Sequence, residues 1–198
     1  MLSRTRSTKL ALIFILLCFS GCSSKQAPLK VYTLNTPMVT QTSSSKFKYK
    51  TIKVMYPQSL KEKISQKMRY SYSNAEQGVY QNSQWSNNIG KLLEGTFIQA
   101  LDGSKLFKAV LPYASTAQED YRLESNIFAF SHQVRGEQSH ALVSMQFSLI
   151  NTDMGKLIKT KRFSYKVATK TMDAKGYVEA TNEAVGRLTK DLLRWLQF

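Results

Sequence analysis

The sequence predicts an α+β fold in which a mostly antiparallel sheet carries two main helices on one face. Two segments repeat apolar residues every three or four positions, as amphipathic helices do. Other segments alternate apolar with polar residues, which is the period of a half-buried strand. The expected order is strands, a helix, a run of strands and a terminal helix. This order is typical of helices packed on one face of an antiparallel sheet.

The first part of the chain is predicted to hold short strands. The segment KVYTL (residues 30–34) is a strand candidate, and residues 38–46, rich in Ser and Thr, are predicted to be a loop. Residues 46–57, KFKYKTIKVMYP, begin by alternating lysine with other residues and end at a proline, so they predict a strand. The segment SNAEQG (73–78) between two tyrosine-containing stretches predicts a hairpin.

The first helix is predicted to begin after a capping residue at Asn82 or Ser83 and to end near Gly103. Its apolar face should contain Trp85, Ile89, Leu92, Leu93, Phe97, Ala100 and Leu101. The second helix should begin near Asp173 and run to the end of the chain, with one stripe formed by Tyr177, Thr181, Ala184, Leu188, Leu192 and Trp195. We expect both tryptophans to pack in the core rather than to anchor the protein at a membrane interface.

Four strands are predicted between the two helices: LFKAVL (106–111), DYRLESNIFAFS (120–131), SHALVSMQFSLIN (139–151) and KLIKTKRFSYKVA (156–168). In the third of these, apolar residues occupy the odd positions from Ala141 to Leu149, while Ser144, Gln146 and Ser148 are polar. This alternation predicts a half-buried antiparallel strand. The segment NTDMG (151–155) then turns the chain into the fourth strand.

The N-terminus has the three parts of an export signal. Arg4, Arg6 and Lys9 precede an apolar run of ten residues, and small residues lead to Cys22. The run is too short to span a membrane, which takes about 20 apolar residues. Small residues before a cysteine are similar to the bacterial lipobox, which predicts a signal peptide at residues 1–21 and diacylglycerol on Cys22. A plain secretory cut and a buried free cysteine are the alternatives.

Residues 22–30 are then expected to form an acylated tether, and residues 31–198 one domain. Several acyl chains give lasting attachment where one does not. Ser23 lacks the aspartate that resembles an inner-membrane retention signal, so we expect the outer membrane, on its periplasmic face.

Positive charge dominates the exported part of the chain. Residues 1–21 hold three of the 28 basic residues and no acidic ones, which leaves 25 basic against 13 acidic residues and a net charge of +12. An exported protein meets anionic lipid headgroups and acidic protein surfaces, so we expect no nucleic-acid partner. The candidate surface for anionic lipid or a partner consists of Lys46, Lys48, Lys50, Lys159, Lys161 and Arg162. An ordinary solvated face is the alternative.

Catalytic and metal-binding patterns are not found in the sequence. It has no nucleophile-elbow serine, no Gly-rich phosphate loop and no His pair at the spacing of zinc enzymes. A hairpin centred on Gly136 would place His132 opposite His140, with Glu137 as a further ligand. Both histidines have the parity that points away from the core, so we interpret them as exposed loop residues rather than metal ligands. We expect no catalytic residue, cofactor or metal.

Several short motifs in order carry a resemblance to a known family. After Cys22 come VYTL with Tyr32 and Leu34, MRYSY, a VY pair before Trp85, and DYRLESNIFAF with Leu123 and Phe130. RFSY and EATNEAVGRLTKDLLRWL, which holds Trp195, complete the series. Together they resemble the ABC-transport auxiliary lipoprotein family, the PqiC-like proteins.

The resemblance implies a function without catalysis. Such lipoproteins are similar to the outer-membrane partners of mammalian-cell-entry (MCE) systems, in which an inner-membrane permease and ATPase work with a periplasmic tunnel protein to move lipids. The implied partners are the MCE-domain protein, the permease and ATPase, the membrane that holds the acyl anchor, and further copies of the chain. Two other classes stay open: an assembly or pilot lipoprotein of an outer-membrane machine (a secretin or barrel) and a periplasmic hydrolase.

Overall fold

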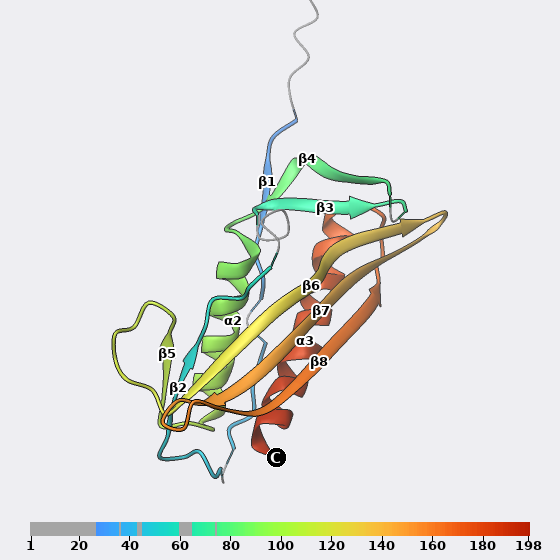
Figure 1. Ribbon diagram of the computed structural model, residues 1–198. Helices are drawn as coiled ribbons and strands as arrows, with labels where there is room; N and C mark the ends of the chain where they lie inside the picture. The colour runs from blue at the N-terminus through green and yellow to red at the C-terminus, as the bar shows by residue number, and fades with distance from the viewer. Residues whose placement is uncertain (1–26, 36, 43–44, 60–64, 74) are drawn as a thin grey trace, which may run out of the picture.

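A twisted sheet and two helices make up the protein (Figure 1). The computed structural model describes residues 27–35, 37–42, 45–59, 65–73 and 75–198. The helices are α2 (Ile89–Ser104) and α3 (Ala174–Gln197). The strands are β1 (Lys30–Tyr32), β2 (Thr51–Val54), β3 (Lys67–Ser71), β4 (Gln77–Trp85), β5 (Ala109–Pro112), β6 (Tyr121–Arg135), β7 (Gln138–Asn151) and β8 (Lys156–Ala168). The α+β class is confirmed.

The sheet is mixed, which corrects the prediction of a mostly antiparallel one. Strands β1-β4-β3-β6-β2-β5 are neighbours in that order, and β7 and β8 continue from the other edge of β6. Among the described strands, the β3–β4, β6–β7 and β7–β8 pairs are antiparallel, whereas β1–β4, β2–β5, β2–β6 and β3–β6 are parallel. Antiparallel hairpins are joined by short turns and leave a local signal, but parallel pairs form between distant segments and leave none.

Strand β6 is the centre of the sheet. One of its edges pairs with β7 from Tyr121 to Arg135. Its other edge pairs first with β2 and, near its end, with β3. The register with β7 shifts between Ile127 and Ala129, so Phe128 is an extra residue in a β-bulge. The bulge changes which residues face the core, because Ile127 and Phe130 are both buried.

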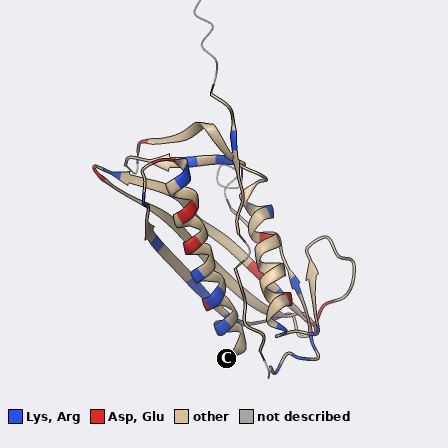
Figure 2. Cartoon of the chain, turned by 180° about the vertical axis from the view of Figure 1, so that it is seen from behind, with Lys and Arg blue, Asp and Glu red and all other residues tan. Residues whose placement is uncertain are grey.

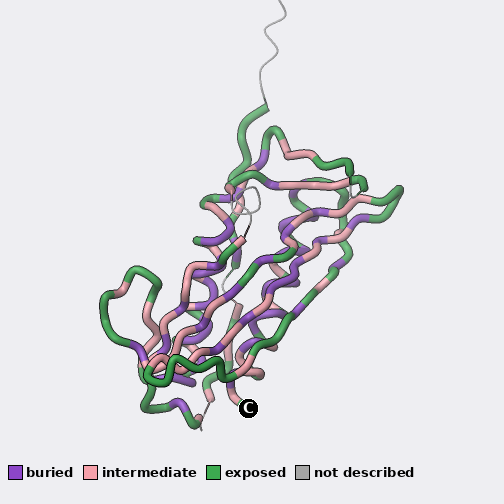
Figure 3. The backbone as a smooth tube through the Cα atoms, in the orientation of Figure 1, coloured by how far each residue is buried: buried purple, intermediate pink, exposed green. Residues whose placement is uncertain are grey.

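Both helices cover the same face of the sheet (Figure 2). Helix α3 packs on β7 and β8, and α2 packs on β2 and β5 and against α3. Helix α3 begins where predicted, with the Asp173 side chain accepting a hydrogen bond from the Gly176 N–H at 2.9 Å. Buried residues alternate along the long strands and follow one side of each helix (Figure 3).

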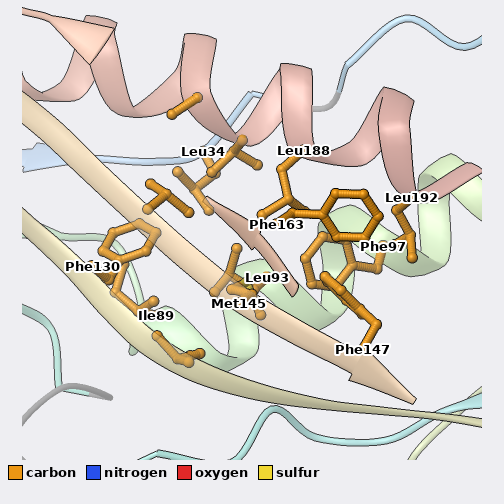
Figure 4. Packing of buried hydrophobic residues seen from close by; sticks show 14 of the residues in the cluster. Leu34, Ile89, Leu93, Phe97, Phe130, Met145, Phe147, Phe163, Leu188 and Leu192 are labelled. Carbon is orange, nitrogen blue, oxygen red and sulfur yellow. The ribbon is translucent and has the colours of Figure 1, made fainter. Parts of the chain in front are cut away.

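The core lies between the sheet and the helices (Figure 4). Phe97 of α2 meets Phe147 of β7 edge to face, with ring centroids 5.2 Å apart. Trp85, 1% exposed, is held between Phe130 and Tyr177, whose ring centroids lie 5.9 and 5.8 Å away. Aromatic pairs at such distances add to the free energy gained from burying their area.

Helix α2 and strands β2 and β5 begin later than predicted; β5 begins at Ala109 instead of Leu106. Helix α2 begins at Ile89 with Asn88 as its cap, because residues 82–85 complete β4 instead. Asn88 accepts the Lys91 N–H at 2.9 Å, which a residue at 82 or 83 cannot do while it belongs to a strand. Residues 46–49 form a turn rather than a strand, because buried Phe47 stacks on Phe107 at 5.0 Å and bends the chain before β2.

We predict that Trp85→Ala lowers the free energy of unfolding by about 3–5 kcal/mol, because it leaves a cavity among packed rings. Urea unfolding followed by circular dichroism measures the change. Tyr49→Ala is the control, since Tyr49 is 81% exposed and a surface change of this kind costs within about 0.5 kcal/mol. Equal effects of the two substitutions would contradict the assignment of Trp85 to the core.

Candidate functional site: a basic and aromatic groove beside helix α3

A groove of about 570 Å³ lies between β8 and the last turns of α3. We call it the C-terminal groove and define it by its lining residues, which are Lys159, Lys161, Phe163, Asp191, Arg194, Trp195 and Phe198. Strand register explains how the lysines reach it. Lys159 pairs with Leu149, and Lys161 pairs with Phe147. Both partners are fully buried, so these lysines leave β8 on the face that the helices cover.

Lys159 caps the C-terminal end of α3. Its ammonium group donates a hydrogen bond to the main-chain carbonyl of Trp195 and lies 4.8 Å from the centroid of the Trp195 ring. A cation at this position satisfies a carbonyl at the negative end of the helix dipole. Burial lowers the pKa of Lys159, and the nearby charge of Lys46 lowers it further. Lys159 therefore stabilises the wall of the groove.

Lys161 differs from Lys159 because its ammonium group can bind a ligand. It is exposed, and its ammonium lies 5.2 Å from the centroid of the Phe163 ring. In the described part of the chain, no acidic side chain forms a salt bridge with it. The groove's own carboxylate, Asp191, accepts hydrogen bonds from Tyr165 and, at 2.9 Å, from Arg194. Burial raises the pKa of Tyr165, and the bond to Asp191 raises it further, so this tyrosine stays a neutral donor.

The groove therefore offers positive charge next to aromatic surface. Trp195 meets Phe163 edge to face at 6.3 Å, and Phe198 is 84% exposed at the open side. Rings of this kind bind apolar or aromatic groups, and a neighbouring ammonium binds a carboxylate or phosphate. None of the lining residues is a Ser, Thr, Cys or His, so the groove has no hydroxyl, thiol or imidazole nucleophile.

The structure brings together only part of the predicted basic surface. Lys46 joins the groove's edge, where its ammonium donates to the main-chain oxygen of Phe198 at 3.1 Å. Lys50 instead pairs with Asp120 at 2.8 Å, and Lys48 lies against the Tyr49 ring at 6.0 Å. The lysine spacing in the sequence could not reveal this separation, because these residues lie in and beside a turn.

Arg162 is on the opposite face of the sheet from Lys159 and Lys161. Its guanidinium carbon lies 4.2 Å from the centroid of the Phe128 ring, and its Nε donates to Ser144 at 3.0 Å. Asp191, Arg194 and Phe198, by contrast, line the groove although sequence reasoning did not identify them. Their signal in the sequence is weak, since a pair three residues apart on a helix normally indicates only a surface ion pair.

The two histidines do not face each other. Gln133 pairs with His140, and His132 pairs with Ala141, so the register is one residue away from the predicted one. His132 is fully buried, which corrects its interpretation as an exposed loop residue. The bulge at Phe128 reverses the parity of β6 beyond it and turns His132 inward. The described residues contain no group of three or more His, Cys, Asp or Glu side chains that could hold a metal.

His132 lies in a polar cluster within the core. Its ring stacks on Tyr177 at 5.1 Å, and its Nδ1 shares a 2.7 Å hydrogen bond with the Tyr80 hydroxyl. Three buried atoms of this cluster have no hydrogen-bond partner among the described residues: His132 Nε2, the Tyr177 hydroxyl and Thr181 Oγ1. Burial lowers the pKa of His132 to about 4; Asp173 opposes this shift and His140 adds to it.

Comparison with known proteins assigns the chain to a family. The family model described as an ABC-type transport auxiliary lipoprotein component matches residues 32–192. The chain belongs to this family. No curated protein matches it.

Two solved structures show that the fold is shared. Protein XCC0632 from Xanthomonas campestris, of the family DUF330, is 18% identical with a TM-score of 0.76, and the match covers 85% of this chain and 95% of that one. An uncharacterized protein is 14% identical with a TM-score of 0.66, and the match covers 86% of this chain and 99% of that one. At these identities the likeness shows the fold alone.

The predicted family-pattern residues of this auxiliary lipoprotein have different surroundings. Leu34, Trp85, Leu123 and Phe130 are buried in the core, and Tyr32 packs against it. Trp195 is partly buried and lines the C-terminal groove. Cys22 lies outside the described residues. Neither helix in the described part of the chain has the length and apolar character needed to cross a membrane.

We predict that the free energy of unfolding falls as the pH drops from about 6.5 to about 4. Between these pH values His132 stays neutral in the folded protein, whereas in the unfolded chain it binds a proton. Acid therefore favours the unfolded state. The loss in free energy of unfolding approaches about 3 kcal/mol as the pH reaches about 4. Urea unfolding at several pH values measures it. In His132→Gln the slope should flatten, whereas His140→Gln should keep it; a wild-type slope in His132→Gln would contradict the assignment.

Proposed function

We propose that this auxiliary lipoprotein is a non-catalytic, membrane-anchored component of an ABC/MCE-type system that moves phospholipid or other hydrophobic molecules between the inner and outer membranes. Its task is to dock the periplasmic tunnel protein. The family match over residues 32–192 supports a role beside an ABC-type transporter. The groove's lining has no Ser, Thr, Cys or His, and its carboxylate, Asp191, is held by Tyr165 and Arg194, which supports a binding role over the hydrolase alternative.

The anchor in this proposal is the acylated Cys22, held in the outer membrane on its periplasmic side. Cleavage before Cys22 would leave eight residues before Lys30, the first residue of β1. Eight residues reach at most about 29 Å when fully extended. The start of β1 therefore stays close to the membrane in which the acyl chains are buried.

The position of the groove relative to β1 is the observation that carries the docking role. The start of β1 and the start of α3 lie at the same end of the molecule, and the last turns of α3, which line the groove, lie at the other end (Figure 1). Helix α3 has 24 residues, which corresponds to about 36 Å at 1.5 Å per residue. A groove this far from the anchor can reach a protein in the periplasm, so the ligand that we propose for it is a protein rather than a headgroup of the anchoring membrane.

The first experiment is affinity purification of the detergent-extracted full-length protein, followed by mass spectrometry of its N-terminal peptide and of its partners. We expect diacylglyceryl Cys22 together with an MCE-domain protein. A lipidated Cys22 found with secretin or barrel subunits would overturn the transport role and keep the anchor. An unmodified Cys22 would overturn the anchor.

We predict that Lys161→Gln weakens binding of the tunnel protein by about five- to tenfold and reduces the dependence of binding on salt, because an exposed charge at the edge of an interface acts mainly in these two ways. Titration of the purified proteins at low and moderate salt measures the effect. Lys166→Gln is the matched control. Lys166 is also exposed on β8, but it pairs with Leu142 and leaves the strand on the other face. Equal losses in both variants would remove the groove from the proposal.

A further inference from the structure

The opposite end of the molecule has a surface that the docking role does not use. It is formed by β1, the β3–β4 hairpin and the loop that leads into α3 (Figure 1). We call it the anchor-side end. Its exposed apolar side chains are Leu29, Val31, Tyr72 and Met172, which are 54%, 56%, 49% and 53% exposed. Exposed apolar groups concentrated beside a membrane anchor require an explanation.

A shallow aromatic groove of about 490 Å³ opens at this end. Tyr70, Tyr72 and Tyr80 line it together with Met172. The Tyr70 ring meets those of Tyr72 and Tyr80 edge to face, each at 5.2 Å. Tyr80 is fixed in turn by its hydrogen bond to buried His132. Tyrosine is the residue type, with tryptophan, that concentrates where a bilayer meets water.

Basic side chains surround the apolar ones. Lys30 of β1, Lys67 of β3 and Lys175 of α3 are all exposed, and Figure 2 shows basic residues at this end of these three elements. Asp173, an acidic residue at this end, accepts the hydrogen bond that caps α3. Hydrogen bonds from the Gly176 N–H and Thr171 lower its pKa, and the charge of Lys30 lowers it further. Two acidic residues lie at the edge of this end: Glu76 is in the turn of the β3–β4 hairpin, where its carbonyl accepts the Tyr72 N–H at 3.0 Å, and Glu137 follows Gly136, which lines the aromatic groove.

We propose that the anchor-side end rests on the membrane surface, with Lys30, Lys67 and Lys175 against anionic phospholipid headgroups and the Tyr72 ring and Met172 at the headgroup boundary. This inference rests on the proposed acyl anchor, since the tether's reach of at most about 29 Å is what keeps this end near the bilayer. It assigns a bilayer, rather than a protein, to this surface because apolar, aromatic and basic groups lie together next to the lipid attachment.

Two contacts with the same membrane would fix the orientation of the domain. Acyl chains alone leave it free to rotate about the tether, but lysines at an anionic surface favour one orientation. Each lysine changes the ratio of docked to undocked protein by about fivefold. In the docked orientation α3 stands away from the bilayer and carries the C-terminal groove toward the periplasm.

A spin label tests this orientation in the full-length lipidated protein. Tyr72→Cys labels the anchor-side end, and Met154→Cys labels the β7–β8 turn, where Met154 is 69% exposed. The 14 residues of β7 separate the two ends, by about 45 Å. Each variant is reconstituted in vesicles of phosphatidylcholine with phosphatidylglycerol, and electron paramagnetic resonance measures collisions of the label with oxygen, which enters lipid, and with a nickel chelate, which stays in water.

We expect the oxygen-to-nickel collision ratio to be several-fold higher at position 72 than at 154. The difference should disappear in pure phosphatidylcholine or when Lys30, Lys67 and Lys175 are all changed to glutamine, which reduces the docked-to-undocked ratio by about 100-fold. Equal ratios at the two positions would overturn the proposal. Exclusion of both oxygen and nickel from position 72 would also overturn it, because a protein would then cover the surface.

Mass spectrometry of the N-terminal peptide from the same sample tests the acyl anchor separately from the membrane contact of the anchor-side end. A lipidated Cys22 with a water-exposed label at 72 overturns the membrane contact and leaves the proposed function intact. An unmodified Cys22 overturns the anchor and this inference with it.

Discussion

The β-bulge at Phe128 is the constraint on which most of the structure depends. Before it, the odd residues of β6 face the helices, and after it the even residues do. This reversal turns Phe130 toward Trp85 and His132 toward Tyr177, so the aromatic and polar parts of the core both follow from one extra residue. A bulge also bends a strand and increases its twist. The bend accounts for the two separate partners of β6, since β2 pairs before the bulge and β3 pairs after it.

The bulge has a consequence on the outer face as well. Phe128 is 41% exposed there, and Arg162 of β8 lies over its ring at 4.2 Å. Strand β7 lies between β6 and β8, so this contact crosses the width of the three long strands. A guanidinium on an aromatic ring contributes about 0.5–1 kcal/mol at an exposed site. Arg162 therefore has a structural role on the face that the helices leave open, and its charge is not available at the C-terminal groove.

The sequence allowed prediction of the parts of the fold that depend on local signals. Both helices follow from their apolar stripes, and Asp173 follows from its capping position. The three hairpins follow from their turns. The parallel pairs of β1, β2 and β3 depend on contacts between distant segments, and nothing in their short sequences specifies the partner. The bulge was equally hidden, because the register shift is visible only in the pairing with β7, and without it the parity of His132 indicates the wrong face. At the groove, the lysines were visible but not their orientation.

The basic residues of β8 illustrate why charge alone overestimates a binding site. Strand β8 is an edge strand, and lysines along such an edge discourage pairing with other chains. Lys159 donates a hydrogen bond to the end of α3, and Arg162 lies over the Phe128 ring. Lys161, which lies beside the Phe163 ring, is therefore the lysine of the groove that can bind a partner. One available ammonium beside the rings of Phe163, Trp195 and Phe198 gives modest electrostatic attraction but considerable apolar surface. Most of the binding free energy should therefore come from aromatic contact. A partner that fits this groove would present an apolar or aromatic side chain with a single carboxylate next to it.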